Sequence, residues 1–357
     1  MGKKAIVKYL QFLTIIISFV ALILTIIGLY GGDVNPTGNE MKALLAFGLP
    51  ILIIINVVIL IYWIIRLKIW VIIPIVSLLI CWNYIGTIFR FDSRPDGADT
   101  EPGIIIASYN VAAFQHEITG YKANDVKSIL SQENASIVCF QEFNDDISAN
   151  GTTVTAAYKD LYPYSIKGIG GQVIFSRYPI KRGETIKFQW GGSTNSAQWA
   201  DININGKNLR VYNVHLLTTS VNQTLHSLAK SGEDKSINEK AAIVINGWED
   251  QFKYRAAQAD ELSNVIRMSD NNSTKILCGD FNDTPYTYSY KRILSNGLVD
   301  GFVTAGHGFM STYRGAKGLL RIDYIFHSED IKGLDYYTKD VDLSDHNPVF
   351  FKIKMPK

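Results

Sequence analysis

The sequence is poor in cysteine, with three in 357 residues: Cys81, Cys139 and Cys278. They provide neither the dense framework of a disulfide-stabilised secreted domain nor a CxxC motif for a thiolate metal site. Cys81 lies in an apolar run, whereas Cys139 and Cys278 lie in expected buried strands, where free cysteine behaves as a small hydrophobic residue. A zinc site built from cysteine is therefore not expected.

Charge is scarce in the first ninety residues, which hold seven of the 35 basic and two of the 33 acidic residues. Three apolar runs fill this part without a charged residue or histidine inside them: about Leu10 to Tyr30, Ala43 to Ile65 and Ile69 to Phe89. Each is close to the ~20 residues with which a helix crosses ~30 Å of hydrocarbon. We therefore predict a membrane anchor of three transmembrane helices over residues 1–90.

Two other interpretations of these apolar runs are weaker. Lys3, Lys4 and Lys8 precede the first run, as in a cleaved secretory signal. However, the run is longer than the apolar part of a usual signal, and no small-x-small cleavage site is evident. A transporter usually needs ionisable residues within the membrane, which these runs lack, so an anchor is favoured.

Basic residues near the ends of the predicted helices indicate their orientation. Five of them would lie on one side of the membrane and three on the other: Lys3, Lys4, Lys8, Arg66 and Lys68 against Lys42, Arg90 and Arg94. This bias predicts a cytoplasmic N-terminus. After three crossings, the remainder of the chain would be extracytoplasmic.

The remainder of the chain also lacks a surplus of basic charge. Residues 91–102 form a polar linker, and residues 103–357 have the composition of a soluble domain. Without the first ninety residues the net charge is about −3. A nuclease that binds duplex DNA usually has a basic surface. No such surplus is present, although a local basic patch remains possible within this sum.

Short apolar segments in the soluble domain predict strands that alternate with helices. Strands are expected at 103–111, 135–143, 170–180, 209–217, 319–327 and 348–354, with another ending at 277, and helices at 123–133, 248–268 and 286–298. The polar stretch from Thr218 to about Asn246 is too long for an ordinary connection, so it is either a functional loop or a helical insertion.

The segment CGDFNDTP, from Cys278 to Pro285, leaves one of these strands. Asp280 and Asn282 are two residues apart, so the alternation of a strand directs both side chains to one side. A carboxylate beside an amide can accept a proton from water while hydrogen bonds hold a reacting oxyanion. Gly, Asp, Asn and Pro are also the residues most common in turns, so this segment alone does not decide between a catalytic site and an ordinary turn.

Polar residues follow or end most of the expected strands. They are Asn110, Glu142, His215, Asp280, Asn282, Asp323, Asp345 and His346. Any one of them is unremarkable, because a lone histidine on a strand is more often structural than catalytic. Eight in this order predict a shared site.

The ordered motifs SYNVA, FQEF, YNVHL, GDFND, RIDYIF and SDHNPV resemble those of the endonuclease/exonuclease/phosphatase superfamily. The resemblance covers essentially all of residues 103–355. It implies an α/β fold, a four-layer sandwich in which two mixed β-sheets pack face to face between helices, with the active site at one rim. It also implies divalent-metal-dependent cleavage of a phosphoester.

By this resemblance, Glu142 is the principal Mg²⁺ ligand, with Asn110 on the metal or phosphate and Asp345 assisting; Mn²⁺ remains possible. These oxygen donors are the type that Mg²⁺ prefers. Asp280 would be the general base that activates water.

The remaining roles concern the phosphate. Asn282, His215 and His346 would contact it or the leaving group, and Asp323 would orient His346. Tyr286 offers an aromatic ring that could stack on a base or a lipid head group, although helix packing explains it equally well.

The substrate is left open among a phosphodiester, a phosphomonoester and a pyrophosphate. The anchor and the slightly acidic domain favour a lipid-linked or small-molecule phosphate. An extracytoplasmic endonuclease or exonuclease is the alternative. A non-catalytic, membrane-bound interaction module is less favoured, because such a descendant would be expected to have lost one of the positions above. The oligomeric state is not indicated.

Overall fold

Two six-stranded β-sheets form the centre of the computed structural model, which describes residues 3–94, 100–116, 121–146, 151–190, 195–218, 237–269 and 274–356. The first sheet consists, in spatial order, of β10 (Leu298–Asp300), β12 (Asp323–Ser328), β9 (Thr274–Asp280), β8 (Lys207–His215), β7 (Ser196–Ile204) and β6 (Ile180–Lys187). The second consists of β13 (Lys332–Thr338), β14 (Val349–Lys354), β2 (Ile104–Asn110), β3 (Ile137–Gln141), β5 (Val173–Ser176) and β4 (Tyr164–Lys167).

Each sheet is mixed and contains one parallel pair among the described strands. β8 runs parallel to β9, and β2 runs parallel to β3. The other pairings in the two sheets are antiparallel.

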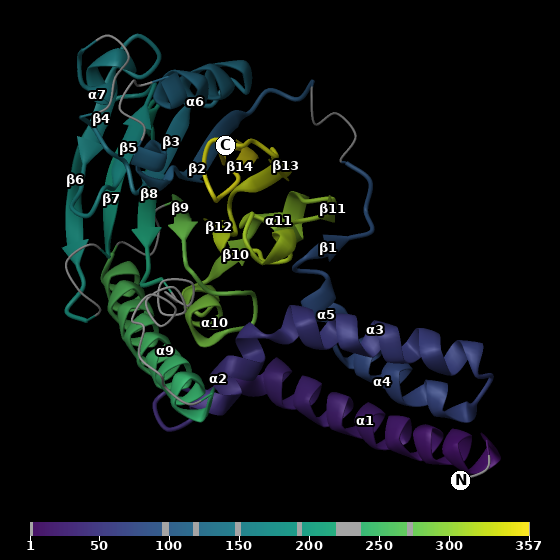
Figure 1. Ribbon diagram of the computed structural model, residues 1–357. Helices are drawn as coiled ribbons and strands as arrows, with labels where there is room; N and C mark the ends of the chain where they lie inside the picture. Colours follow the sequence, from purple (N-terminus) through teal and green to yellow (C-terminus); the bar gives the residue numbers. More distant parts are fainter. Residues whose placement is uncertain are drawn as a thin grey trace.

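The two sheets pack face to face, and helices cover their outer faces (Figure 1). Alternate residues of each strand fill the core between the sheets, among them Cys139 and Cys278, which are both fully buried. α6 (Tyr121–Gln132) and α7 (Val154–Ala157) pack on the second sheet, and α9 (Ile237–Met268) and α10 (Tyr288–Leu294) on the first. α11 (Gly301–Ala305) packs beside β13. The predicted four-layer α/β architecture is thus found.

The strands expected from apolar segments correspond to β2, β3, β5, β8, β9, β12 and β14, and the expected helices to α6, α9 and α10. Within the two sheets, the sequence pattern missed β6, which has no fully buried residue, the longer strands β7 and β13, and the short strands β4 and β10. Within the polar stretch 218–246, residues 219–236 lie outside the described residues, and α9 already begins at Ile237.

The N-terminal apolar part differs from the prediction of three spanning helices. It contains α1 (Lys3–Gly31), α2 (Glu40–Phe47), α3 (Leu49–Ile65), α4 (Ile72–Ile80) and α5 (Trp82–Ile85). Among the described residues one helix, Ala5–Gly31, is long and apolar enough to cross a membrane, and the pair α2 and α3 is bent by 63°. The prediction of three spans is therefore wrong: the second run is bent at Gly48, and the third is broken into short helices.

The N-terminal part packs directly against the two-sheet domain (Figure 1). β1 (Phe89–Arg90) pairs with β11 (Gly308–Phe309), and the Met310 amide donates to the Ile88 carbonyl at 2.9 Å. The Thr284 hydroxyl donates to the Phe47 carbonyl at 3.0 Å. These contacts join the two parts at the second apolar run and at the end of the third.

A buried ion pair strengthens this junction. Arg321 is fully buried and donates to both carboxylate oxygens of Asp300, at 2.7 and 2.6 Å, and to the Thr87 carbonyl at 2.8 Å. Its guanidinium also lies over the rings of Phe302 and Tyr324. A charge buried to this extent requires such partners, because it has lost its water.

We expect Arg321→Met to lower stability by about 3–5 kcal/mol, because it leaves the carboxylate of Asp300 buried without its counter-charge. Arg314→Met is the matched control, since Arg314 pairs with the exposed Asp340 and its loss should cost about 1 kcal/mol or less. Thermal unfolding of the full-length protein measures both. Equal melting temperatures for the two variants would contradict the expectation.

Candidate active site

The carboxyl ends of the two parallel strand pairs bring polar residues to one rim of the sandwich. Asn110 ends β2, and Glu142 directly follows β3. In the first sheet, His215 at the end of β8 is in register with Asp280 at the end of β9. Parallel neighbours end at the same edge of a sheet, which is why these four residues meet there.

Two antiparallel strands begin at the same rim. Asp323, the first residue of β12, pairs with Asp280. His346 lies just before β14, whose first residue Val349 pairs with Ser108 of β2. The structure therefore gathers side chains from both sheets into one cluster.

Asp280 lies at the centre of this cluster and is only 1% exposed. Its carboxylate accepts hydrogen bonds from the backbone N–H of Asn282 at 2.8 Å and from the side-chain Nδ2 of Asn282 at 3.2 Å. Asn110 Nδ2, from the other sheet, donates to it at 3.0 Å. Donors to an ionised carboxylate stabilise its charged form and fix its orientation.

Glu142 forms the more accessible side of the cluster, with 44% of its side chain exposed. Asn110 Nδ2 donates to Glu142 Oε1 at 3.0 Å as well as to Asp280. His215 Nε2 lies 3.7 Å from both Glu142 Oε1 and Asp280 Oδ2. The side chains of Asn110 and His215 thus both face the carboxylates of Glu142 and Asp280.

His346 and Asp323 form a buried pair beside Asp280. His346 Nδ1 lies 2.9 Å from Asp323 Oδ2, and His346 Nε2 lies 3.7 Å from Asp280 Oδ2. Burial lowers the pKa of His346, but the carboxylates of Asp323 and Asp280 outweigh it and raise that pKa to about 10. The two carboxylates therefore favour the charged form of His346, and its Nε2 lies on the side of Asp280.

The donor set fits a hard divalent cation. Glu142 and Asp280 provide carboxylate oxygens that both accept from Asn110 Nδ2, and Glu142 is partly open to solvent, as suits Mg²⁺, which takes oxygen ligands and keeps several waters. Asp280, Asp323 and His346 form a second candidate group, with one donor atom from each within 4.8 Å of the others. In that group the contact between Asp323 and His346 is already made.

Three predicted site residues lie differently from their expected roles. Asn110 directs its Nδ2 toward the carboxylates, so its orientation here is that of a donor to them. Asp345 is exposed, and its backbone carbonyl accepts from the Arg314 amide. Tyr286 packs edge-on against Tyr84 of the N-terminal part, with 5.4 Å between ring centroids; the structure does not bring it into the cluster.

Asn282 is also engaged within the protein. Its Nδ2 donates to the Leu216 carbonyl at 3.0 Å in addition to Asp280. Asn282 and Glu142 both have left-handed backbone conformations, with φ of 51° and 52°. Such conformations are uncommon for residues other than glycine and cluster at functional sites.

Arg255 supports the site, and the sequence analysis did not identify it. This fully buried residue of α9 donates to the Leu217 carbonyl at 2.7 Å and lies 3.1 Å from Asp283 Oδ2. It thereby links the strand end that carries His215 to the turn that carries Asp280. A signal was present, because Arg255 falls three residues after Phe252 on the predicted apolar face of this helix.

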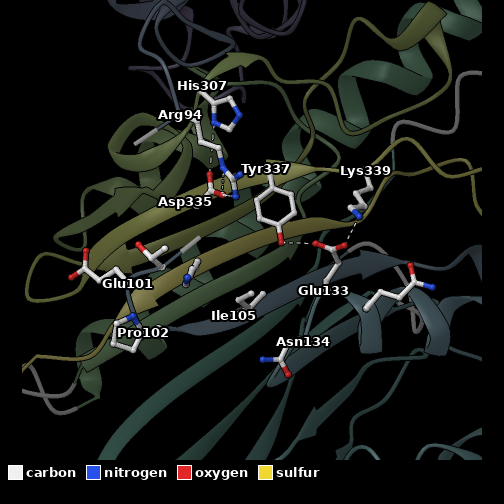
Figure 2. A pocket seen from close by; sticks show the side chains of 14 residues that line it. Arg94, Glu101, Pro102, Ile105, Glu133, Asn134, His307, Asp335, Tyr337 and Lys339 are labelled. Atoms are coloured by element: carbon white, nitrogen blue, oxygen red, sulfur yellow. Dashed lines mark hydrogen bonds and ion pairs between the residues drawn. The ribbon is translucent and has the colours of Figure 1, made fainter. Parts of the chain in front are cut away.

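A pocket of about 660 Å³ lies at the opposite end of the second sheet (Figure 2). It opens beside Ile105 near the start of β2, whereas Asn110 ends that strand at the active rim. Its charged groups pair with one another: Arg94 with Asp335, and Lys339 with Glu133. These contacts serve the structure at that end and are separate from the cluster.

Comparison with known proteins identifies the family. The sequence profile of the endonuclease/exonuclease/phosphatase family matches residues 107–346. The chain belongs to the endonuclease/exonuclease/phosphatase family. A domain of unknown function matches residues 10–88. No curated protein matches the chain.

A solved structure of an endonuclease/exonuclease/phosphatase protein shares this fold. A member from Bacteroides vulgatus is 17% identical, with a TM-score of 0.53 over 71% of this chain and 100% of that one. A beta toxin variant from Staphylococcus aureus with bound magnesium ions is 18% identical, with a TM-score of 0.49 over 71% and 100%. Sphingomyelinase C from Streptomyces griseocarneus is 16% identical, with a TM-score of 0.47 over 71% and 99%. At these identities the likeness concerns the fold.

We expect Arg255→Met to loosen the turn after β9, because it leaves the Asp283 carboxylate buried without its cation. Amide hydrogen exchange at Phe281 and Asn282 should accelerate by about tenfold or more, while Val211 in the middle of β8 stays protected. Lys253→Met, two residues away on α9 with a partly exposed side chain, is the control and should leave both regions unchanged. Unaltered exchange at Phe281 in Arg255→Met would refute this supporting role.

Proposed function

We propose that this endonuclease/exonuclease/phosphatase protein is a membrane-anchored, Mg²⁺-dependent phosphoesterase that hydrolyses its substrate by in-line attack of water. The observation that carries the proposal is the convergence of Asn110, Glu142, His215, Asp280 and His346 at one rim, from both sheets. We also propose that the chain has three parts: an N-terminal anchor within residues 1–90, a linker at 91–102 and a catalytic domain at 103–357.

The side chains divide the chemical work by their surroundings. Asp280 faces the two histidines and is the base that accepts a proton from the attacking water. His346, held by Asp323 and cationic, donates from Nε2 to the oxygen on which negative charge develops. His215 Nε2 lies 3.7 Å from the same Asp280 oxygen, Oδ2, as His346 Nε2 does, and its role would be to stabilise the leaving group.

Glu142 would hold the cation, which would supply Lewis-acid stabilisation of the negative charge on the phosphate oxygens. Asn110 keeps the carboxylates of Glu142 and Asp280 at a fixed separation by donating to both. Mn²⁺ presents similar coordination preferences and is the natural alternative metal.

The membrane anchor rests on α1. The window of this helix has a mean hydropathy of 2.8, and only 28% of it is buried within the protein, unlike the core helix of a soluble domain. Large exposed apolar surfaces mark contact with a membrane or a partner. With the excess of basic residues around Lys3, Lys4 and Lys8, we propose a cytoplasmic N-terminus and an extracytoplasmic catalytic domain.

Asp280→Asn and His346→Ala should each lower Mg²⁺-dependent hydrolysis of bis-p-nitrophenyl phosphate by about 100-fold or more, because each removes a group that acts in the transition state. Asp342→Asn makes the same chemical change at an exposed carboxylate and is expected to retain full activity. Melting temperatures report whether each variant is folded.

Removing the metal with EDTA should abolish turnover by the full-length protein, and added Mg²⁺ should restore it. A folded Asp280→Asn variant with near wild-type turnover would show that the assignment of the base is wrong. Full activity in EDTA would contradict the metal dependence. If the protein cleaves plasmid DNA but not lipid phosphates, the hypothesis of a nuclease replaces that of an enzyme acting on lipid-linked phosphates.

A further inference from the structure

An apolar groove of about 500 Å³ runs along the N-terminal part where it meets the catalytic domain. Hydrocarbon and aromatic side chains from both parts form its walls. Those used below are Ile54 and Val57 of α3, Leu79 of α4, Trp82 of α5, and Phe309 and Leu319 of the catalytic domain. Leu79 and Phe309 are largely exposed, so the groove is open along its length.

One wall of the groove leads to His346. Leu319 lies in the groove, and the carbonyl of the next residue, Leu320, accepts from the Tyr313 amide at 3.1 Å. Tyr313 in turn forms a β-bridge with His346, and the two rings lie 5.2 Å apart. The segment that lines the groove therefore also contacts the proposed acid.

The other wall leads to Asp280. Pro50 and Ile54 of α3 line the groove, and α3 begins just after Phe47. The Phe47 carbonyl accepts from the Thr284 hydroxyl at 3.0 Å, four residues beyond Asp280. The groove is thus bounded by the two segments that continue into the catalytic cluster.

We propose that this groove binds the hydrocarbon chain of a lipid phosphate ester and so presents the ester to Asp280 and His346. The inference rests on the proposed phosphoesterase function and specifies its substrate class. The occupant is a lipid chain because the groove offers hydrocarbon contact without hydrogen-bond partners along α3 and α4, and these two helices pack against α1, which is of membrane-spanning length. At its end Trp82 stacks on Phe91 at 5.6 Å, as aromatic residues do at a membrane interface.

The test uses two adjacent valines of α3 in the full-length protein, purified in dodecyl maltoside. Val57 lines the groove and is 39% exposed, whereas Val58 points away from it and is 60% exposed. Val57→Trp fills the groove, and Val58→Trp adds the same side chain to the outer surface. The substrates are hexadecyl p-nitrophenyl phosphate and methyl p-nitrophenyl phosphate, which share the scissile bond.

We expect Val57→Trp to lower kcat/KM for the hexadecyl ester at least tenfold and to leave the methyl ester within twofold of wild type. Val58→Trp should leave both substrates within twofold. Unchanged turnover of the methyl ester also shows that each variant is folded. Equal hexadecyl turnover in Val57→Trp and Val58→Trp would overturn the inference.

A binding measurement separates this inference from the proposed function. Calorimetric titration with hexadecylphosphonate should show at least tenfold weaker affinity for Val57→Trp than for Val58→Trp, whether or not the esters are hydrolysed. If the wild-type protein hydrolyses neither ester, the proposed function is wrong. The titration then still shows whether the groove binds a hydrocarbon chain. Equal affinities, or a change in the oligomeric state of Val57→Trp by light scattering without weaker binding, would identify another role for the groove and overturn the inference.

Discussion

The hydrogen bond from Asn110 to Asp280 connects the two sheets at the point where the chemistry is concentrated. Asp280 lies in a nearly solvent-free position, so its carboxylate oxygens depend on hydrogen-bond donors from the protein. Asn282 supplies two donors from the same turn, and Asn110 supplies the third from the opposite sheet. Because Asn110 also donates to Glu142, the packing of one sheet on the other determines how far apart the two carboxylates lie.

This constraint explains why so much of the surrounding structure is rigid. Gly279 precedes Asp280 with φ of 144°, and a Cβ there would lie 1.9 Å from the Val214 carbonyl oxygen. Neighbouring strands are therefore closer at this point than any side chain on residue 279 would permit. Arg255 holds the other side of the turn from α9. The charged cluster is thus supported by close backbone packing on one side and a buried cation on the other.

Sequence patterns predicted the strand ends well and their partners poorly. Asp280 and Asn282 were expected together because a period of two is a local property of the chain. Periodicity does not reveal which other strand end faces them, because that depends on long-range contacts such as Asn110 with Asp280, 170 residues apart. The family motifs indicated these long-range partners instead. Arg255 was missed because its helix was interpreted through its apolar residues alone, although a charge on that face required a partner.

In the N-terminal part, the sequence pattern predicted a longer second and third helix than the structure contains. Hydropathy measures the length and composition of an apolar run, and by that measure three runs qualify. It does not register the bend at Gly48 or the break at Cys81 between α4 and α5, which divide those runs into shorter helices. Likewise, the sequence places Tyr286 at the start of a predicted helix and does not reveal its partner; its ring packs on Tyr84, because the apolar part docks against the turn beyond the catalytic strand.

The pairing of β14 with β2 has a consequence for biosynthesis. Ser344, whose hydroxyl donates to the Asn110 carbonyl at 2.7 Å, lies 234 residues after it in the chain. A ribosome adds about 5–20 residues per second, so roughly ten seconds or more separate the appearance of these two partners. During that interval the apolar helices have already emerged while the catalytic rim still lacks His346 and the strand behind it. A nascent chain therefore remains an inert precursor and gains its charge arrangement only when the late strand inserts beside the early one.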